Sequence, residues 1–413
     1  MRLFRLEIKR IMKSRRTLTL LAAALLMSIV MAYLPISFES INRPGEDGKI
    51  IELGGLPAIQ FKRDYFEKTA GNITPQKLAE ALRTYQSYVK EYGTLNDVPL
   101  DIYIENIMAI RPMLRGLIEA FADPKTGIGA DLMDIDPDEV EQYFYEKCVS
   151  HLDDTMNLEQ KEYEAARQFA AGRYADVDQP FYLYPGMSRD AFDYTTLYIL
   201  VLSILCVAIA SPAFANEYQT GSGSDSILRC TKYGRMKLAV TRILSVCCIF
   251  IVIFILGMSI HLLILNLAFG TDCLKTSFQM LFSVINLPNI NLGQLQIILV
   301  LAGLLSVLAI VSCTLFLSAR CRDSLTVLLI SIVILFLPIF AYGALGDTWI
   351  GGIVPSAGIG MKNNFLYQLC DFNFLHIGGM SFWTPYVILV SAAVEIPLFL
   401  FLTVRSYCKH QVA

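Results

Sequence analysis

The sequence reads Asn-Glu-Tyr-Gln-Thr-Gly-Ser-Gly-Ser-Asp-Ser-Ile-Leu-Arg-Cys-Thr-Lys-Tyr-Gly-Arg-Met-Lys from residue 216 to residue 237. This polar, basic stretch lies between two apolar runs, residues 193–215 and 238–269. About 20 apolar residues are enough to cross a bilayer as a helix, and both runs reach that length. A soluble protein has no reason to place so charged a loop between two such runs. The stretch therefore indicates a membrane protein with a loop at the membrane surface.

The overall composition agrees with that interpretation. Hydrophobic residues make up 54% of the chain and charged residues 17%, against about 45–50% and about 25% in soluble domains. The mean hydropathy is +0.50. We predict an all-α integral membrane protein with six transmembrane helices. The six apolar runs are residues 17–36, 193–215, 238–269, 294–318, 324–346 and 382–404.

The charges are distributed unevenly along the chain. Residues 38–192 hold 28 acidic and 16 basic residues, which leaves 9 acidic and 18 basic residues elsewhere. Loops rich in Lys and Arg stay on the cytoplasmic side of a membrane. With six spans, this rule predicts a multi-pass protein of the cell membrane with both termini cytoplasmic. Residues 38–192 then form a large extracytoplasmic domain.

The N-terminus has a basic head before its apolar run, as a signal peptide also does. The run is longer than a signal core, and no small-x-small cleavage site precedes Phe38. We therefore expect residues 17–37 to be a retained transmembrane helix. Residues 1–16 alternate apolar with basic residues, which predicts a cytoplasmic amphipathic helix at the inner membrane interface.

The segment 38–192 is expected to be helical. Thr74-Pro75 and Asp136-Pro137 each place an N-cap and a first-turn proline ahead of apolar residues at helical spacing. Asn157 with Gln160 resembles a capping box that opens a third helix through Phe169. A fourth helix, residues 99–122, is interrupted by Pro112. No alternating strands bounded by glycine stand out.

No metal site is predicted. A calcium loop beginning at Asp134 would need Gly at its sixth and Glu at its twelfth position, and these are Glu139 and Tyr145. The ten cysteines form no disulfide framework, although a bridge between Cys273 and Cys370 stays open.

The five later spans, within residues 193–413, are joined by two longer connections. Residues 347–381 are rich in Gly, Pro, Asn and aromatic residues, which makes them a candidate re-entrant segment packed against protein. Residues 272–293 could be re-entrant or an ordinary surface loop.

The chain contains no P-loop, serine elbow or zinc-binding His-Glu-x-x-His. We expect no catalytic residue, no metal and no cofactor in this chain. If the protein performs chemical work, another polypeptide must supply the energy.

The polar loop resembles the cytoplasmic loop of bacterial type 2 ABC exporter permeases, and more narrowly that of Gram-positive drug and peptide exporters. The resemblance rests on Glu217-Tyr-Gln-Thr-Gly221, Ile227-Leu228 and Thr231-Lys-Tyr-Gly-Arg235, followed by Lys237-Leu238. It implies that 216–237 couples the membrane helices to a separate ATPase. The residues implied in coupling are Glu217, Gly221, Ile227, Leu228, Thr231, Lys232, Tyr233, Gly234 and Arg235.

The resemblance also implies partners. It predicts a pair of ABC ATPase subunits that bind ATP and Mg, and a dimer with a second copy or a homologous permease. Segment 38–192 departs from the family, whose members mostly have a far shorter loop there. Residues 222–226 and Lys232, where many members have Pro, depart as well.

The spacing within the loop fits a short coupling helix. Ile227, Leu228 and Thr231 would share one helical face that can enter a cleft on an ATPase. Arg229, Lys232 and Arg235 can meet an acidic rim or lipid phosphates. The alternative is a basic loop that only fixes orientation.

Glu395 lies in the last apolar run, ahead of Pro397. A carboxylate there should face protein or water. It could line a translocation path, or it could be protonated and bonded to a neighbouring span. His261 and Asn266 are expected to form hydrogen bonds between helices.

Together these features predict a permease subunit that exports an amphipathic substrate, such as an antimicrobial peptide, a lipid-like molecule or a drug. Direction and substrate stay open, and no nucleic-acid partner is expected. The negative charge of 38–192 would suit capture of a cationic peptide or gating of the exit. The alternatives are a membrane sensor whose extracytoplasmic domain binds a ligand, and a structural membrane protein or channel.

Overall fold

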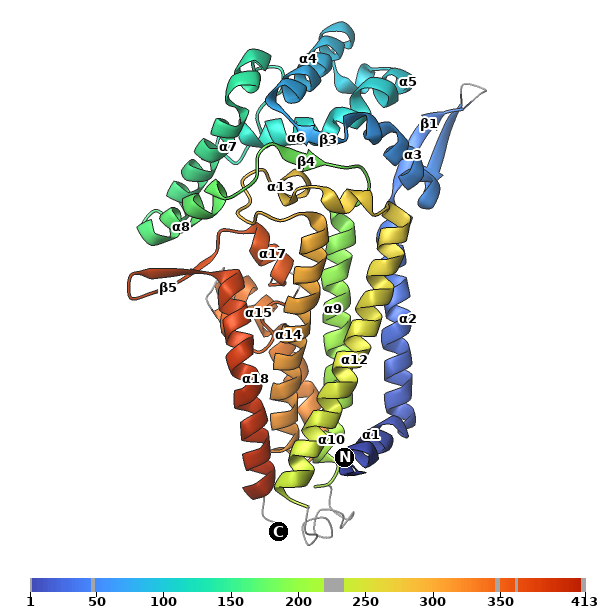
Figure 1. The fold of residues 1–413 in the computed structure, drawn as a ribbon, viewed down its shortest axis with the longest axis vertical. Helices are drawn as coiled ribbons and strands as arrows, with labels where there is room; N and C mark the ends of the chain where they lie inside the picture. Colours follow the sequence, from blue (N-terminus) through green and yellow to red (C-terminus); the bar gives the residue numbers. More distant parts are fainter. Residues whose placement is uncertain (1, 46–48, 219–233, 346–349, 361–362, 410–413) are drawn as a thin grey trace.

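The computed structural model describes residues 2–45, 49–218, 234–345, 350–360 and 363–409 (Figure 1). It is mostly helical, and six of its helices are long and apolar enough to cross a membrane. The predicted number of candidate spans is therefore confirmed within the described residues. They are α2 (Arg15–Phe38), α9 (Arg189–Ala210) continued by α10 (Pro212–Ala215), α12 (Met236–Phe269), α14 (Leu292–Ser318), α15 (Ser324–Leu345) and α18 (Thr384–Lys409).

Local capping explains several of the helix ends. Ser14 accepts a hydrogen bond from the Thr17 backbone N–H at the start of α2. Asn291 and Gln294 form a reciprocal capping box that starts α14 two residues before the predicted position. Asp323 accepts from the Thr326 backbone N–H and opens α15 after a tight turn. α9 begins four residues earlier than predicted.

The long helices run side by side, and both chain termini lie at the same end of the bundle (Figure 1). α1 (Arg2–Met12) lies across that end and packs against α12. Polar side chains join the helices inside the bundle. His261 of α12 contacts the Thr195 hydroxyl of α9 at 3.0 Å, and Asn266 exchanges amide hydrogen bonds with Gln296 of α14. The predicted interhelical role of His261 and Asn266 is confirmed.

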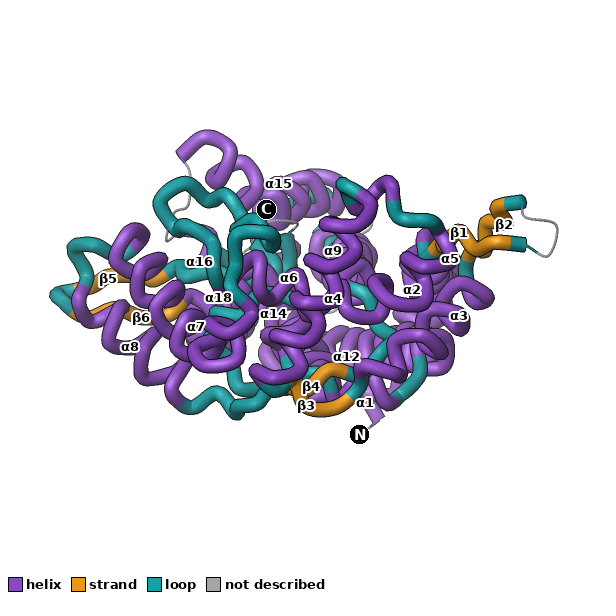
Figure 2. Tube along the Cα trace, turned by 90° about the horizontal axis from the view of Figure 1, so that it is seen from above, coloured by secondary structure: helices purple, strands orange, loops and turns teal. Residues whose placement is uncertain are grey.

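Residues 39–188 form a helical cap over the opposite end of the bundle (Figures 1 and 2). Its buried core includes Leu82, Leu117, Phe144 and Cys148. The core is continuous with the nearest part of the bundle. The cap comprises β1 (Ser40–Pro44), β2 (Ile50–Gly54), α3 (Leu56–Phe66), β3 (Gly71–Ile73), α4 (Pro75–Tyr92), α5 (Leu100–Ile102), α6 (Arg111–Ala120), α7 (Pro137–Glu159), α8 (Glu164–Ala175) and β4 (Phe181–Leu183).

The cap confirms two predicted helix starts and corrects a third. Thr74 and Asp136 each cap a helix whose first residue is proline. Asn157 does not open a helix, because α7 runs through it to Glu159, burying one residue in every four. Gln160 instead follows the end of α7 and donates to the Phe372 carbonyl. The helical region around Pro112 is broken, and that proline lies in the first turn of α6.

The described residues contain three two-stranded antiparallel sheets, two of them in the cap, where no alternating strand stands out in the sequence. β1 pairs with β2, with Ser40 opposite Gly54, and β3 pairs with β4, with Gly71 opposite Leu183. β5 (Phe374–Ile377) and β6 (Met380–Trp383) turn through Gly378 and Gly379, whose φ angles are 57° and 85°. Positive φ at both turn residues favours glycine. This hairpin occupies the predicted start of the last span, so α18 begins at Thr384.

Two connections join spans on the side of the cap, and residues 350–353 of the second pack against α15 and α18 of the bundle. The first holds a 3₁₀ turn (Asp272–Lys275) and α13 (Phe278–Leu281), and the second holds α16 (Ile350–Ile353) and α17 (Phe365–Cys370). Tyr174 of the cap donates to the Val284 carbonyl at 2.7 Å. Cys273 and Cys370 are both free thiols, so the bridge left open by the sequence is absent here.

Candidate functional site

The ends of the polar loop are held at the end of the bundle that carries the termini. Glu217 lies two residues after the end of α10, and Arg235 is the exposed residue before α12. Gly234 is buried beside it. The other residues implied in coupling lie outside the described residues: Gly221, Ile227, Leu228, Thr231, Lys232 and Tyr233. Only the two ends of the loop can therefore be placed against the bundle.

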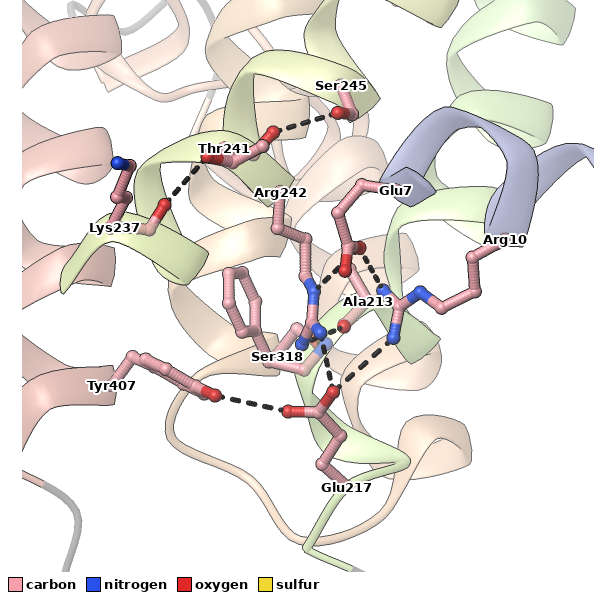
Figure 3. Close-up of polar contacts among 11 residues, drawn as sticks. Glu7, Arg10, Ala213, Glu217, Lys237, Thr241, Arg242, Ser245, Ser318 and Tyr407 are labelled. Carbon is pink, nitrogen blue, oxygen red and sulfur yellow. Dashed lines mark hydrogen bonds and ion pairs between the residues drawn. The ribbon is translucent and has the colours of Figure 1, made fainter. Parts of the chain in front are cut away.

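Glu217 forms a buried ion pair with Arg242 of α12 (Figure 3). Arg242 Nη2 lies 2.5 Å from Glu217 Oε1, and Arg242 Nε lies 3.3 Å from Oε2 of Glu7 in α1. Arg242 is 1% exposed and both carboxylate residues are 7% exposed. A guanidinium can satisfy two carboxylates at once because its donors lie in a planar fork. Arg242 thus connects α1, α12 and the start of the polar loop.

Two further side chains complete the group. Arg10 Nη2 lies 2.9 Å from Glu7 Oε2, and Arg10 Nη1 lies 3.3 Å from Glu217 Oε1. Tyr407 of α18 donates its hydroxyl proton to Glu217 Oε2 at 3.3 Å. Desolvation lowers the pKa of Arg10 from its ordinary value, and the nearby Arg242 cation lowers it further. We call Glu7, Arg10, Glu217, Arg242 and Tyr407 the basal cluster.

The basal cluster is fixed to its surroundings by backbone contacts. Arg242 Nη1 donates to the Ala213 carbonyl at 3.2 Å, and the guanidinium lies 5.1 Å from the Phe214 ring centroid. Ser318 at the end of α14 accepts from the backbone N–H groups of Phe214 and Ala215. Its own hydroxyl donates to the Ser211 carbonyl. α10 is therefore held by side chains from both α12 and α14.

The charges within the cluster balance, with two guanidinium groups facing two carboxylates. Breaking a buried ion pair by removing one partner costs about 3–5 kcal/mol, because an uncompensated charge remains buried. The arrangement can therefore act as a rigid joint. A force applied to the polar loop next to Glu217 would reach α1, α12 and α18 together.

Sequence reasoning singled out Glu217 but missed its partners. Glu7 is the one acidic residue among the basic residues of α1, and Arg242 lies within a run of apolar residues. Glu7 is thus an acidic residue isolated among basic ones, and Arg242 is a cation isolated among apolar residues. Such isolated charges are the sequence signal by which both residues could have been identified. Nothing in the sequence pairs them, because they lie more than 200 residues apart.

Glu395 lies apart from the basal cluster. It is half-buried in α18 and close enough to Cys313 of α14 to interact with it electrostatically. α18 packs along α14. Both the translocation role and the structural role of this carboxylate stay predictions.

No group of His, Cys, Asp or Glu side chains suited to a metal ion occurs among the described residues. No protein-family model matches the chain, and no curated protein matches it.

Proposed function

We propose that this chain is the membrane-spanning subunit of an ATP-driven exporter, and that a separate ATPase grips the polar loop. The observation that carries the proposal is the basal cluster. It ties the start of a loop between two candidate spans, through Glu217, to α12, to a helix at the N-terminus and to the last span. The energy would come from ATP and Mg bound by the partner.

The distribution of charge supports a cytoplasmic position for that end of the bundle. The basic residues of α1, the turn with Arg320 and Arg322, and Arg405 with Lys409 all lie at the end carrying the termini. Under the positive-inside rule this end faces the cytoplasm and the helical cap faces outward. An ATPase in the cytoplasm would then meet the polar loop directly.

The proposed mechanism depends on the basal cluster acting as a rigid connection between the helices. Closure of an ATPase dimer would pull the loop, and Glu217 would carry the movement to Arg242 and Tyr407. The spans α12 and α18 would then tilt relative to α2, alternating access to a path between them. An amphipathic substrate, such as a peptide, a lipid-like molecule or a drug, suits a path bordered by apolar helices. The working unit would be a dimer with a second copy or a homologous permease.

The experiment measures how tightly transport is coupled to ATP hydrolysis. The chain is expressed with the product of its neighbouring reading frame and reconstituted in vesicles, and ATP hydrolysis and transport are measured on the same sample. We expect Glu217→Gln and Gly221→Ala to reduce transport per ATP while ATP hydrolysis persists. Arg405→Gln removes an exposed cation at the same end and serves as the matched control. Unchanged transport per ATP in both loop variants would remove these residues from the coupling mechanism.

A membrane sensor remains the second candidate, because the helical cap contains a cavity of about 680 Å³. Pockets of about 300–1,000 Å³ commonly hold small ligands. A sensor would bind ligand without consuming ATP, so the same reconstitution distinguishes the two functions.

A further inference from the structure

The cavity in the helical cap lies where the cap meets the bundle. Its walls come from α3, α6, the residues directly after α2, and the segments 183–188 and 276–292. The apolar part of the lining includes Ile59, Leu114 and Met280. Its position beside the ends of the spans would place it near a membrane interface.

The charges lining this cavity are opposite in sign to those of the cap as a whole. Residues 38–192 contain 28 acidic and 16 basic residues. The lining contains four of these basic residues, Lys62, Arg63, Arg111 and Arg115, and a single acidic residue, Glu39. Glu39 is already paired with Lys62 at 2.6 Å. Arg63 is half-buried, Arg111 and Arg115 are exposed, and the charge of Asp272 also acts on Arg63. The lining still carries more positive than negative charge, which favours anions.

Two of the three arginines are held in place by uncharged groups. Arg111 donates to the Tyr103 hydroxyl at 2.9 Å, and Arg115 donates to the backbone carbonyls of Leu281 and Phe282. Among the described residues, no carboxylate lies within ion-pairing distance of Arg63, Arg111 or Arg115.

Gly270 makes room for the Arg63 guanidinium. A Cβ built on Gly270 would lie 2.5 Å from Arg63 Cζ, so a larger residue there would push the end of the arginine side chain aside. The φ of Gly270 is +86°, which other residues rarely adopt. The Arg63 guanidinium, which borders the cavity, thus packs directly against the Gly270 backbone.

Ser188 provides a second, independent observation that points to a bound ligand. Its hydroxyl is buried, lines the same cavity, and has no hydrogen-bond partner among the described residues. Ser188 also precedes the first turn of α9 without capping it through its side chain. A helix N-terminus favours negative charge. A hydroxyl and a helix start therefore face the same space as the arginines.

We propose that this cavity binds an amphiphile with an anionic head group, a phosphate or carboxylate on an apolar tail. The arginines would bind the head through charge-assisted hydrogen bonds, and the apolar wall would hold part of the tail. The proposal does not rest on the proposed transport function, because it concerns binding by this chain alone.

The test uses the purified full chain in lipid nanodiscs without any ATPase. A dodecanoate carrying a photoreactive diazirine is crosslinked, and the labelled peptides are located by mass spectrometry. We expect saturable labelling of peptides from α3, α6 and segment 183–188. Dodecyl phosphate should displace the probe, whereas dodecyltrimethylammonium, with the same tail and a cationic head, should not.

Variants test the arginines directly. Arg63→Gln combined with Arg111→Gln should weaken labelling by about tenfold or more, because charge-assisted contacts are lost. The corresponding double change to Lys should retain most of it. Lys161→Gln removes an exposed cation elsewhere on the cap and should have no effect.

Three results would overturn the proposal. The first is labelling of the cavity peptides equal to that of peptides on the bundle surface, and the second is competition by the cationic amphiphile as strong as that by dodecyl phosphate. Displacement by inorganic phosphate at the same concentration would show an anion site with no role for the tail. If the double Gln variant does not fold, the competition series with the unmodified chain still decides between these results.

Discussion

Replacing Arg242 with Met should destabilise the folded chain, because Arg242 is the central cation of the basal cluster. The substitution leaves Glu7 and Glu217 buried with only Arg10 between them, and it removes a donor from the Ala213 carbonyl. Loss of one partner from a buried ion pair costs about 3–5 kcal/mol. Since Arg10 still contacts both carboxylates, we expect the lower end of that range, about 3 kcal/mol.

The assay is thermal unfolding of the purified chain in nanodiscs, followed by intrinsic fluorescence at a fixed scan rate. A loss of about 3 kcal/mol corresponds to a fall in Tm of roughly 3–5 °C for a chain of 413 residues, because the unfolding entropy grows with chain length. Arg405→Met, at an exposed position of the same end, should leave the Tm nearly unchanged. The double variant Glu217→Gln/Arg242→Met should recover part of the loss, because the uncompensated carboxylate is then neutral. A fall in Tm for Arg242→Met no larger than that for Arg405→Met would show that the basal cluster does not stabilise the fold as a buried ion-pair network.

Three further predictions concern other parts of the fold. Ser318→Ala should lower stability by about 1–3 kcal/mol, since the backbone N–H groups of Phe214 and Ala215 lose their acceptor; an unchanged Tm would show that water replaces the hydroxyl. Asn266→Leu should cost about 0.6–2 kcal/mol, and adding Gln296→Leu should restore most of the loss because neither amide is then left unpaired. Desolvation lowers the pKa of His151 in the cap, so the unfolded chain binds its proton more readily, and cap stability should fall as the pH drops below about 6.5. His151→Gln should flatten that part of the pH profile, and an unaltered profile would assign the pH dependence to other groups.

The candidate spans could be predicted from the sequence because length and apolarity alone decide them. Residues 193–215 and 238–269 are apolar on all sides, and no tertiary contact is needed to recognise them. The exact ends of the spans depend on local caps. Asn291 with Gln294, for example, moves the start of α14 two residues ahead of its predicted position.

Features that depend on contacts between distant segments could not be predicted. The capping box at Asn157 failed because a run of buried residues spaced by four carries α7 past it. The β5–β6 hairpin had a local signal in Gly378-Gly379, but its surrounding strands are only four residues long. The basal cluster joins α1 to residues more than 200 positions away, and no local pattern contains that pairing.

On the proposed function, this chain receives its energy from a separate ATPase through the polar loop. The most direct measurement is co-purification of the tagged chain with the product of the neighbouring reading frame that carries a Walker motif, followed by an ATPase assay of the complex. We predict that the ATPase is retained in a fixed ratio and that Glu217→Gln alters the hydrolysis rate of the complex. An ATPase that neither binds the chain nor changes its rate in the presence of the chain would contradict the claim.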